Sequence, residues 1–458
     1  MTPRADAFVF FGATGDLARK MIFPALYRLV KAKRLDIPVI GVAFSGWDAA
    51  QLAKRVTESV VAYDGLDDRD ALDRLLSLVR YVDGDYNDPK TFDALRTTLG
   101  EARHPVHYLA IPTTLFATVV SRLGDSGCAR DGRVVVEKPF GHDLASAREL
   151  NRVLSTVFPE DAIYRIDHFL GETAVLNILY LRLANSLLDT LFDRRHVTRV
   201  QITMAEDFGV EDRGSFYDAT GCLLDVVENH VFQIVSLLAM DAPALHAPDA
   251  LRQAQAHLFQ SIRPLVSADV VRGQYRGYRA IHGVRPDSEV ETFVALRLFV
   301  DSPRWAGVPF VIRAGKRLPV TATEAVVEFA DPPLDAFPQV PVAPGPTYLR
   351  FRLSPDVATA VALRVLAQGR RPSAKVEELL LTRREPDSQT PYERLLGGAI
   401  ESTPGLFVRQ DTVEACWRIV AGVLTERAPA LPYEPGTWGP PQAAAIVEPG
   451  RWLDPRLA

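Results

Sequence analysis

The chain has 458 residues, of which 47% are apolar and 24% are charged, and its formal net charge at pH 7 is −5. This composition is typical of a globular protein of two or three domains and excludes a disordered or fibrous chain. The excess of acidic groups disfavours binding to nucleic acid, which requires a basic surface.

The first part of the chain alternates predicted strands with predicted helices. An apolar run at 7–11 ends at a glycine turn and is followed by an amphipathic helical pattern. Further β-rich runs occur at 38–45, 106–112 and 133–141. Alternation of this kind predicts a parallel, doubly wound sheet. We therefore expect a Rossmann-like α/β dinucleotide-binding domain over residues 1–163.

The later residues follow a different pattern, in which strands succeed one another with few helices between them. We predict strands at 199–207, 291–301, 308–316, 325–331 and 347–354. Helical patterns cover 172–193, 219–240, 391–400 and 411–426, and the proline-rich segment 331–346 is expected to be a loop or an edge connection. Runs of strands favour an antiparallel or mixed sheet. Residues 164–458 are therefore predicted to form an α+β domain with a large, mainly antiparallel sheet.

The sequence lacks the usual patterns of export and of membrane insertion. Its three cysteines, Cys128, Cys222 and Cys416, form no CxxC pair, which disfavours a zinc site and a disulfide framework and fits a reducing compartment. The N-terminal apolar run is too short for a signal peptide, and no run of about 18 apolar residues follows. We expect a cytoplasmic protein without a membrane partner.

Small residues recur at three-residue intervals where the first predicted strand turns into the first predicted helix. Gly12 permits a tight turn, and Gly15 lets the backbone approach a pyrophosphate at the N-terminus of the helix. Ala18 takes the third position of the pattern. A pair of glycines also fits a plain tight turn, but its place on the first strand-to-helix connection favours a dinucleotide-binding site.

The residues that end the second predicted strand are expected to meet the adenine ribose of a dinucleotide. The strand ends at Phe44 and Ser45, and Asp48 lies beyond them. No arginine is present there to pair with the 2′-phosphate of NADP. Phe44 could stack on adenine or belong to the core.

Two histidines are accompanied by carboxylates and are candidates for acid–base chemistry. Asp167 and His168 follow a strand-like stretch, His230 lies five residues after Asp225, and Glu206 ends a predicted strand. Hydride transfer from an alcohol needs a base for the hydroxyl proton, and a histidine held by a carboxylate supplies one near neutral pH. The spacing does not decide between the two histidines, and either of them could be a structural residue.

Several motifs, in order along the chain, resemble those of the glucose-6-phosphate dehydrogenase family. The segment GATGDLARK after the first strand is similar to the family's cofactor turn, and the most specific motifs are EKPFG at 137–141 and YRIDHFLG at 164–171. Further similar segments are DVVENH (225–230), VIRAGKRL (311–318), PYERLL (391–396), FVRQDTVEACWRI (407–419) and GTWGP (436–440). Spaced motifs in one order are hard to obtain by chance, so the chain is identified as a member of this family.

The resemblance implies an enzyme that oxidises the anomeric carbon of glucose 6-phosphate to 6-phosphogluconolactone and passes the hydride to NADP or NAD, without a metal. His230 would be the general base and Asp167 its carboxylate partner. The implied substrate-binding residues are His168, Glu172, Lys138, Glu206, Asp225 and Lys316. The implied cofactor-binding residues are Gly12, Thr14, Gly15, Asp16, Leu17, Phe44, Ser45 and Lys138. Family members usually dimerise through the large sheet, so a homodimer or homotetramer is expected.

Four positions depart from the pattern of the family, and each departure removes a polar recognition group. Glu172 stands where the family has a lysine that holds the substrate phosphate, and Phe169 replaces a tyrosine. Thr321 occupies the place of a basic residue, and Phe44 replaces the arginine that meets the 2′-phosphate of NADP. The last change weakens the case for NADP.

The acid at position 172 bears most directly on the substrate, because two like charges about 4 Å apart repel each other by roughly 4 kcal/mol at an effective dielectric of ~20. Arg165 or Arg182 could hold the phosphate instead, or the substrate could be a non-phosphorylated or amino sugar. A third alternative is a non-catalytic cofactor-binding paralogue. We favour a working dehydrogenase with glucose 6-phosphate as the default substrate, because a chain that no longer catalysed would have no chemical reason to keep a base with its carboxylate.

Overall fold

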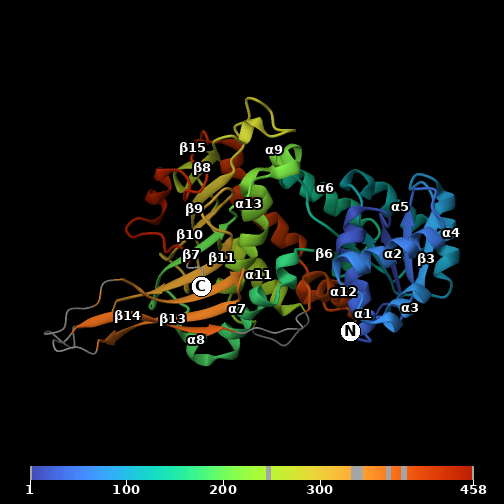
Figure 1. Ribbon diagram of the computed structural model, residues 1–458, viewed down its shortest axis with the longest axis horizontal. Coiled ribbons are helices and arrows are strands. Elements are labelled where there is room, and N and C mark those ends of the chain that lie inside the picture. Colours follow the sequence, from blue (N-terminus) through green and yellow to red (C-terminus); the bar gives the residue numbers. More distant parts are fainter. Residues whose placement is uncertain are drawn as a thin grey trace. The chain divides into compact units, whose positions relative to one another are not determined.

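The computed structural model describes residues 3–243, 249–331, 343, 345–367, 373–382 and 389–455 (Figure 1). The chain forms two compact units. The first unit contains Met1–Thr173, Pro243–Ala256 and Ser388–Glu414, and the second contains Ala174–Ala242, His257–Asp387 and Ala415–Ala458. The expected division at 163/164 stays a prediction. The expected proline-rich loop at 331–346 lies largely outside the described residues.

A sheet of six parallel strands forms the centre of the first unit, in the order β3-β2-β1-β4-β5-β6. Its strands are β1 (Ala7–Phe11), β2 (Val39–Ala43), β3 (Val79–Asp83), β4 (Pro105–Leu109), β5 (Arg133–Val136) and β6 (Ile163–Arg165). This order confirms the predicted Rossmann-like, doubly wound fold, in which ligands bind at the carboxyl ends of the strands where the order reverses. Here that point lies between β1 and β4.

Helices cover both faces of this sheet because successive side chains of a strand point to opposite faces. Phe8 and Phe10 of β1 pack into a core shared with helices on one side. Phe11 faces the other side, where its ring stacks 6.1 Å from that of Phe92. The helices on the first side are α1 (Phe23–Lys31), α2 (Ala49–Tyr63), α3 (Arg69–Leu78) and α12 (Pro391–Glu401); α4 (Pro89–Leu99), α5 (Phe116–Asp125) and α6 (Leu144–Ser155) follow on the other.

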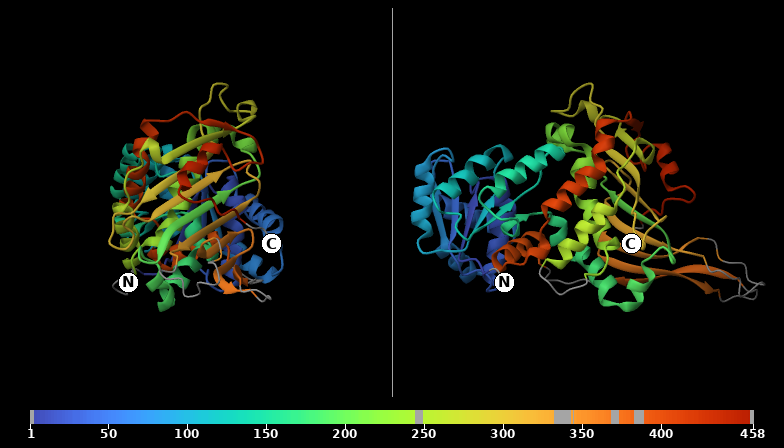
Figure 2. Two further views of the ribbon diagram at one scale, coloured as in Figure 1. Left: turned by 90° about the vertical axis from the view of Figure 1, so that its left-hand side faces the viewer. Right: turned by 180° about the vertical axis from the view of Figure 1, so that it is seen from behind.

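The second unit is built on a nine-stranded sheet in the order β14-β13-β12-β11-β7-β10-β9-β8-β15. Figure 2 shows its strands side by side in one twisted layer. The strands are β7 (Val197–Ala205), β8 (Val270–Tyr275), β9 (Phe293–Phe299), β10 (Pro309–Gly315), β11 (Ala322–Phe329), β12 (Thr347–Ser354), β13 (Ala358–Leu366), β14 (Ala374–Thr382) and β15 (Leu431–Tyr433). Among the described strands of this nine-stranded sheet, only β7–β10 and β8–β15 pair in parallel, so the predicted mainly antiparallel sheet is confirmed.

The longer helices agree with the predicted ranges but are subdivided. The predicted helix 172–193 is interrupted at Asn185, whose backbone is extended (φ −123°, ψ 105°). The predicted helix 219–240 contains a π-helical segment in its middle. The bounds are α7 (Thr173–Ala184), α8 (Ser186–Leu191), α9 (Gly214–Cys222), η6 (Leu223–Val231), α10 (Phe232–Ala239), α11 (Ala250–Ser261) and α13 (Gln410–Thr425). Short helical turns are η1 (Ala18–Ile22), η2 (Thr113–Leu115), η3 (Glu160–Ala162), η4 (His168–Gly171), η5 (Glu211–Arg213), η7 (Ser267–Asp269), η8 (Tyr278–Ala280), η9 (Pro404–Leu406) and η10 (Pro441–Val447).

One helical stretch among the described residues, Glu211–Ala239, is long and apolar enough to cross a membrane by length and composition. This property of the stretch was not predicted from the sequence. Its most apolar window is 83% buried inside the protein, which is the behaviour of an internal helix that packs in a core.

The core of the first unit depends on the ring of Phe10, which is fully buried and meets the ring of Phe23 edge-on at 5.4 Å. We expect Phe10→Ala to remove about 3–5 kcal/mol of stability, because it leaves a cavity in the core. Thermal unfolding should show a midpoint lower by several degrees or more. The matched control is Phe44→Ala, since Phe44 is 72% exposed and its loss should leave the midpoint nearly unchanged. Equal effects of the two changes would contradict the described core.

Candidate functional site

The turn after β1 has the backbone geometry of a phosphate cradle. Gly12 has φ +85°, and a Cβ atom there would lie 2.2 Å from the carbonyl oxygen of Ala110, so only glycine fits. The Gly12 N–H donates to the Val42 carbonyl (2.9 Å), and the Gly15 N–H donates to the Gly12 carbonyl (2.9 Å). Thr14 is half-buried, Gly15 and Asp16 are exposed, and the helix begins at Asp16 and Leu17. This glycine cradle ahead of a helix N-terminus fits a dinucleotide pyrophosphate.

The loop after β2 presents Phe44 and Ser45 to solvent. The Phe44 ring is 72% exposed, so the alternative in which it belongs to the core is wrong. The Ser45 hydroxyl lies 2.8 Å from that of Tyr81, a residue of the neighbouring strand β3. Because β1 and β2 are parallel neighbours, this loop and the Gly12 turn occupy the same edge of the sheet.

Lys138 and Asp167 follow the ends of β5 and β6, which pair in parallel through Val136 and Arg165. Glu137 interacts with the charges of both residues. Its carboxylate accepts hydrogen bonds from the hydroxyls of Tyr108 and Tyr392. Burial raises the pKa of Glu137 and the charge of Asp167 adds to the shift, whereas the two tyrosines and Lys138 oppose it. Glu137 was not predicted as a supporting group, although it lies within the EKPFG motif.

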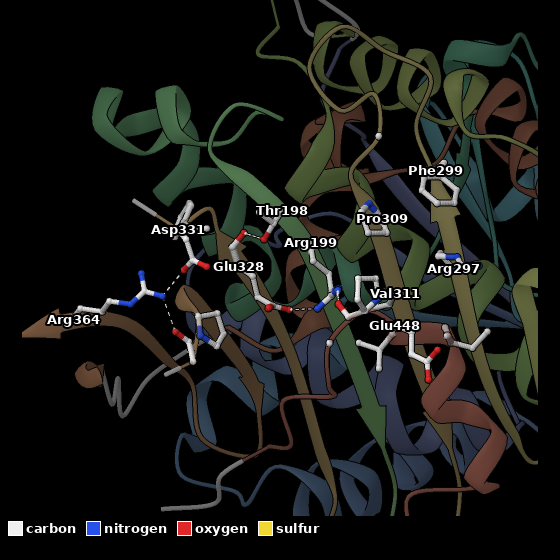
Figure 3. Close-up of a pocket in the computed structure, with 18 of the residues that line it drawn as sticks. Thr198, Arg199, Arg297, Phe299, Pro309, Val311, Glu328, Asp331, Arg364 and Glu448 are labelled. Atoms are coloured by element: carbon white, nitrogen blue, oxygen red, sulfur yellow. Dashed lines mark hydrogen bonds and ion pairs between the residues drawn. The ribbon is translucent and has the colours of Figure 1, made fainter. Parts of the chain in front are cut away.

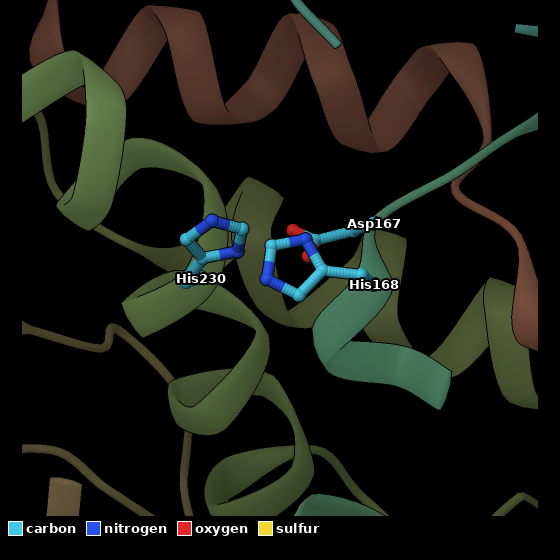
Figure 4. Close-up of side chains that lie close together, drawn as sticks. All are labelled: Asp167, His168 and His230. Atoms are coloured by element: carbon cyan, nitrogen blue, oxygen red, sulfur yellow. The ribbon is translucent and has the colours of Figure 1, made fainter. Parts of the chain in front are cut away.

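Asp167 and His168 begin the short helical turn η4, and His230 lies on η6 (Figure 4). Asp167 is 1% exposed, and its Oδ1 accepts a hydrogen bond of 3.0 Å from the Phe169 N–H, as an N-cap does. His168 is half-buried. Turn η4 packs closely on α12, since a Cβ on Gly171 would lie 2.7 Å from the Pro391 carbonyl oxygen. Helix α12 thus holds the turn that carries the acid and the imidazole.

Glu172 directly follows this turn and is half-buried. Burial raises the pKa of its carboxyl group, and the nearby charge of Arg394 on α12 opposes that shift. The Arg394 guanidinium also donates to the Thr173 hydroxyl at 2.7 Å. A cation therefore accompanies the acid that replaces the family's lysine.

The suggestion that Arg165 or Arg182 holds the phosphate is wrong, because both guanidinium groups are buried and already hydrogen-bonded within the protein. Arg165 is 1% exposed and forms two hydrogen bonds to the Glu160 carboxylate, of 2.8 and 3.0 Å. Arg182 is fully buried and donates to the carbonyl groups of Leu237 and Met240. Neither can bind a phosphate without giving up these partners.

Glu206 and Lys316 meet at one edge of the nine-stranded sheet. They follow β7 and β10, which are parallel neighbours that pair Ala205 with Gly315, so the two chain ends emerge together. The Lys316 ammonium lies 2.5 Å from the Glu206 carboxylate, and Lys316 is only 7% exposed. A buried lysine needs such a partner to remain charged. The structure thus brings these two predicted site residues together.

Two aromatic rings hold the same ammonium group. The Lys316 Nζ lies 5.1 Å from the ring centre of Phe208 and 5.2 Å from that of Tyr217, within the range of cation–π attraction. The Tyr217 hydroxyl is buried. Burial raises the pKa of Tyr217, and Cys222, Asp225 and other nearby acids raise it further. Tyr217 was not predicted as a site residue, because it lies in none of the motifs of the sequence.

Asp225 and His230 both lie on the π-helical segment η6. In an α-helix, residues five apart point about 140° away from each other, because each residue turns the helix by about 100°. The i→i+5 hydrogen bonding of a π-helix brings such residues close to one turn apart, and π segments are frequent at functional sites. His230 is 7% exposed and Asp225 is half-buried. Segment η6 therefore turns the carboxylate and the imidazole toward one face.

A glycine kink directs the chain into η6. Gly221 has φ +68°, and a Cβ there would lie 2.5 Å from the Glu291 Oε1. The same carboxylate accepts a hydrogen bond of 3.2 Å from the Leu223 N–H and pairs with Arg272 at 2.5 Å. A buried ion pair thus fixes the point at which η6 begins.

A separate pocket of about 830 Å³ lies in the second unit and holds none of the predicted site residues (Figure 3). Several of its charged groups are paired with one another. Arg199 lies 3.5 Å from the Glu328 carboxylate, and Arg364 pairs with Asp331 and donates to the Gly345 carbonyl. Arginines that are already paired with carboxylates attract an anion only weakly, so this pocket is not proposed as a ligand site.

The sequence matches two family models that together cover nearly the whole chain. The model described as "Glucose-6-phosphate dehydrogenase, NAD binding domain" matches residues 9–177, and "Glucose-6-phosphate dehydrogenase, C-terminal domain" matches residues 179–452. The chain belongs to the glucose-6-phosphate dehydrogenase family. The predicted family and the predicted oxidoreductase class are therefore confirmed.

Curated relatives and solved structures agree along the full length. The chain is 42% identical to Glucose-6-phosphate 1-dehydrogenase 1 of Mycobacterium bovis over 455 residues, which cover 99% of this chain and 97% of the relative. It is 36% identical to Glucose-6-phosphate 1-dehydrogenase of Dickeya dadantii over 481 residues, 97% of each chain. The structure of Glucose-6-phosphate 1-dehydrogenase from Mycobacterium avium has a TM-score of 0.92 at 42% identity and 99% coverage of both chains. A glucose-6-phosphate dehydrogenase in complex with glucose-6-phosphate has a TM-score of 0.92 at 29% identity and 100% coverage of both.

The match to an NAD-binding domain confirms a nicotinamide dinucleotide as the cofactor. The choice between NAD and NADP and the roles of the individual site residues stay predictions. The glycine cradle at Gly12 independently fits this cofactor.

We expect Gly12→Ala to weaken the binding of both NADH and NADPH by tenfold or more, because the methyl group would collide with the Ala110 carbonyl where the backbone must approach the pyrophosphate. Fluorescence titration with each reduced dinucleotide measures this effect. The control is Gly405→Ala, where a Cβ would meet only the Leu251 side chain, at 3.8 Å. Unchanged affinity in Gly12→Ala would show that the pyrophosphate binds elsewhere.

Proposed function

We propose that this chain oxidises glucose 6-phosphate at its anomeric carbon and reduces a nicotinamide dinucleotide. The observation that carries the proposal is the full-length similarity to enzymes of that name, one of them solved with glucose 6-phosphate bound. The acid, base and lysine positions that such a reaction needs are all present in the chain. The product of the reaction is the 6-phosphogluconolactone.

In the proposed reaction, His230 takes the proton of the anomeric hydroxyl group as the carbon of that group loses a hydride. The bound dinucleotide supplies the acceptor for the hydride. Both electrons of the carbon–hydrogen bond leave with the hydride, so a carbonyl group forms and the sugar becomes a lactone. Asp167 pairs with the imidazole and stabilises its charged form, as a buried carboxylate does for a catalytic histidine. The burial of both groups supports these roles.

The remaining site residues are proposed to hold the sugar. Glu206 and Asp225 accept hydrogen bonds from sugar hydroxyls. Lys316 and Lys138 donate hydrogen bonds to sugar hydroxyls. The close Glu206–Lys316 pair supports this, because each side chain holds the other in place for binding. His168 is proposed to contact the phosphate.

Glu172 is proposed to lie in the phosphate subsite together with Arg394. The arginine offsets part of the repulsion between the acid and the phosphate, which supports the use of a phosphorylated sugar despite the missing lysine. A non-phosphorylated or amino sugar is the second candidate substrate, and Glu172 is the observation that favours it. An ammonium group on the sugar would pair with this carboxylate.

The cofactor is proposed to be NADP or NAD, with Phe44 in the place of an arginine weakening the case for NADP. Phe44 is exposed at the edge where the adenine would lie, which supports its stacking on the base. The protein is proposed to act in the cytoplasm as a homodimer or homotetramer. Leucines exposed on β13 and β14 support association of this kind, among them Leu366, Leu379 and Leu381.

The proposal is tested by measuring the reduction of NAD and NADP with glucose 6-phosphate, glucose and an amino sugar. The highest kcat/KM is expected with glucose 6-phosphate. A higher value with glucose or the amino sugar would favour the second candidate substrate. Cofactor binding without turnover of any of the three sugars would favour a non-catalytic paralogue.

We expect His230→Asn to lower kcat by about 10²–10⁴-fold, because asparagine cannot accept the hydroxyl proton. The affinity for NADH should stay near that of the wild type. His282→Asn serves as the control, since His282 is exposed and has no proposed role. Undiminished turnover in His230→Asn would contradict the assignment of the base.

We expect Glu172→Lys to lower the KM for glucose 6-phosphate by about tenfold or more, because it replaces repulsion of the phosphate by attraction. If Glu172 contacts the phosphate, the KM of the wild type should also depend on pH. Because the pKa of Glu172 is raised, its carboxyl group takes up a proton at a higher pH than an ordinary glutamate does, and the repulsion of the phosphate fades as the pH is lowered.

The KM of the wild type should therefore fall relative to that of Glu172→Gln as the pH is lowered, since the glutamine variant carries no titrating group at this position. The comparison cancels the titration of the phosphate itself. Identical KM values in all three proteins at every pH would place Glu172 outside the phosphate subsite.

A further inference from the structure

Asp83, the last residue of β3, closes the loop that follows β2. Its Oδ1 accepts hydrogen bonds from the Ser45 N–H (3.0 Å) and the Gly46 N–H (2.9 Å). The Tyr81 hydroxyl donates to the same oxygen at 2.8 Å. The parallel pairing of Ala43 with Asp83 brings the acid to this position. One carboxylate thus occupies two adjacent backbone donors at the end of the second strand.

This loop is the part of a Rossmann-like fold that meets the adenine ribose. A 2′-phosphate binds there through positively charged side chains and backbone N–H groups. A free 2′-hydroxyl is instead recognised by a carboxylate that accepts a hydrogen bond from it. In this chain the two backbone donors are already taken by an anion of the protein, and the place of an arginine is held by Phe44.

We propose that Asp83 is the residue that makes this site select NAD over NADP, by filling the anion-binding N–H groups of the β2 loop and by placing a negative charge where a 2′-phosphate would lie. This inference rests on the proposed dinucleotide-dependent function. The three hydrogen bonds described all go to Oδ1, so Oδ2 is the oxygen that can accept a hydrogen bond from the ribose hydroxyl.

The hydrogen bonds around Asp83 keep the acid charged. Burial acts to raise the pKa of Asp83, but the N–H groups of Ser45, Gly46 and Trp47 and the Tyr81 hydroxyl outweigh it, and the pKa is lowered. Burial, and with it the charge of Asp83, raises the pKa of Tyr81 to about 12, so the phenol keeps its proton and acts as a donor. The acid is therefore an anion at neutral pH and repels a second one.

One cation lies beside the loop and offers the opposite interaction. The Arg55 guanidinium of α2 stacks on the indole of Trp47, 5.0 Å from the ring centre. Its charge could attract a 2′-phosphate if the loop opened toward it. The inference therefore requires that the carboxylate of Asp83, which is fixed to the loop itself, outweighs this arginine.

The test measures the binding of NADH and NADPH to the full-length protein by fluorescence titration, and the competition of 5′-AMP and 2′,5′-ADP against bound NADH. The wild type should bind NADH about tenfold or more tightly than NADPH. Asp83→Asn keeps the shape of the side chain but removes the charge, and it should reduce this ratio on the order of tenfold, mainly through tighter binding of NADPH. Asp83→Ser, which opens the N–H groups, should act in the same direction and serves as the second variant if Asp83→Asn folds poorly.

Asp93→Asn is the charge-matched control, because this exposed acid of α4 lies in the same unit and outside the loop, and it should leave the ratio unchanged. Phe44→Arg should tighten NADPH further in the Asp83→Asn background than in the wild type. A wild type that prefers NADPH, or an unchanged ratio in both Asp83 variants, would overturn the inference. A wild type that binds neither dinucleotide would overturn the proposed function as well.

Discussion

Parallel pairing of strands is the constraint on which the arrangement of the candidate site residues within each unit depends. In the first unit it brings the ends of β1, β2 and β3 to one edge, where the Gly12 turn, Ser45 and Asp83 meet. In the second unit the pairing of β7 with β10 delivers Glu206 and Lys316 to the same place. Antiparallel neighbours would send these residues to opposite edges. The direction of the strands therefore decides which side chains can lie next to each other at each sheet edge.

The sequence predicted the features that rest on local pattern. Strand and helix alternation identified the doubly wound sheet, and ordered motifs identified the family. Strands β13 and β14 escaped prediction, because several of their apolar side chains are exposed and the alternation that marks a half-buried strand is weak. The change from α-helix to π-helix in η6 also escaped, since it alters the register of backbone hydrogen bonds and leaves no mark in composition.

Supporting groups were harder to foresee than the groups they support. Glu137 contacts Tyr392 and Tyr217 contacts Lys316, which are both distant in sequence, so only the folded structure shows these partners. The suggested roles of Arg165 and Arg182 failed for the same reason, because burial and backbone partners cannot be read from charge alone. Under the proposed function, Glu172 and Asp83 are two acids that each stand near a phosphate group of a ligand.

The close packing of Gly171 against Pro391 belongs to a larger pattern. The core under the six-stranded sheet includes Leu395, Leu396 and Phe407, which are more than two hundred residues from the strands that they cover. A nascent chain that has just released its first 173 residues from the ribosome therefore lacks part of the core of its N-terminal unit. The core of this unit can be completed only after nearly the whole chain has been synthesised. Its folding is therefore late and depends on contacts between distant parts of the sequence.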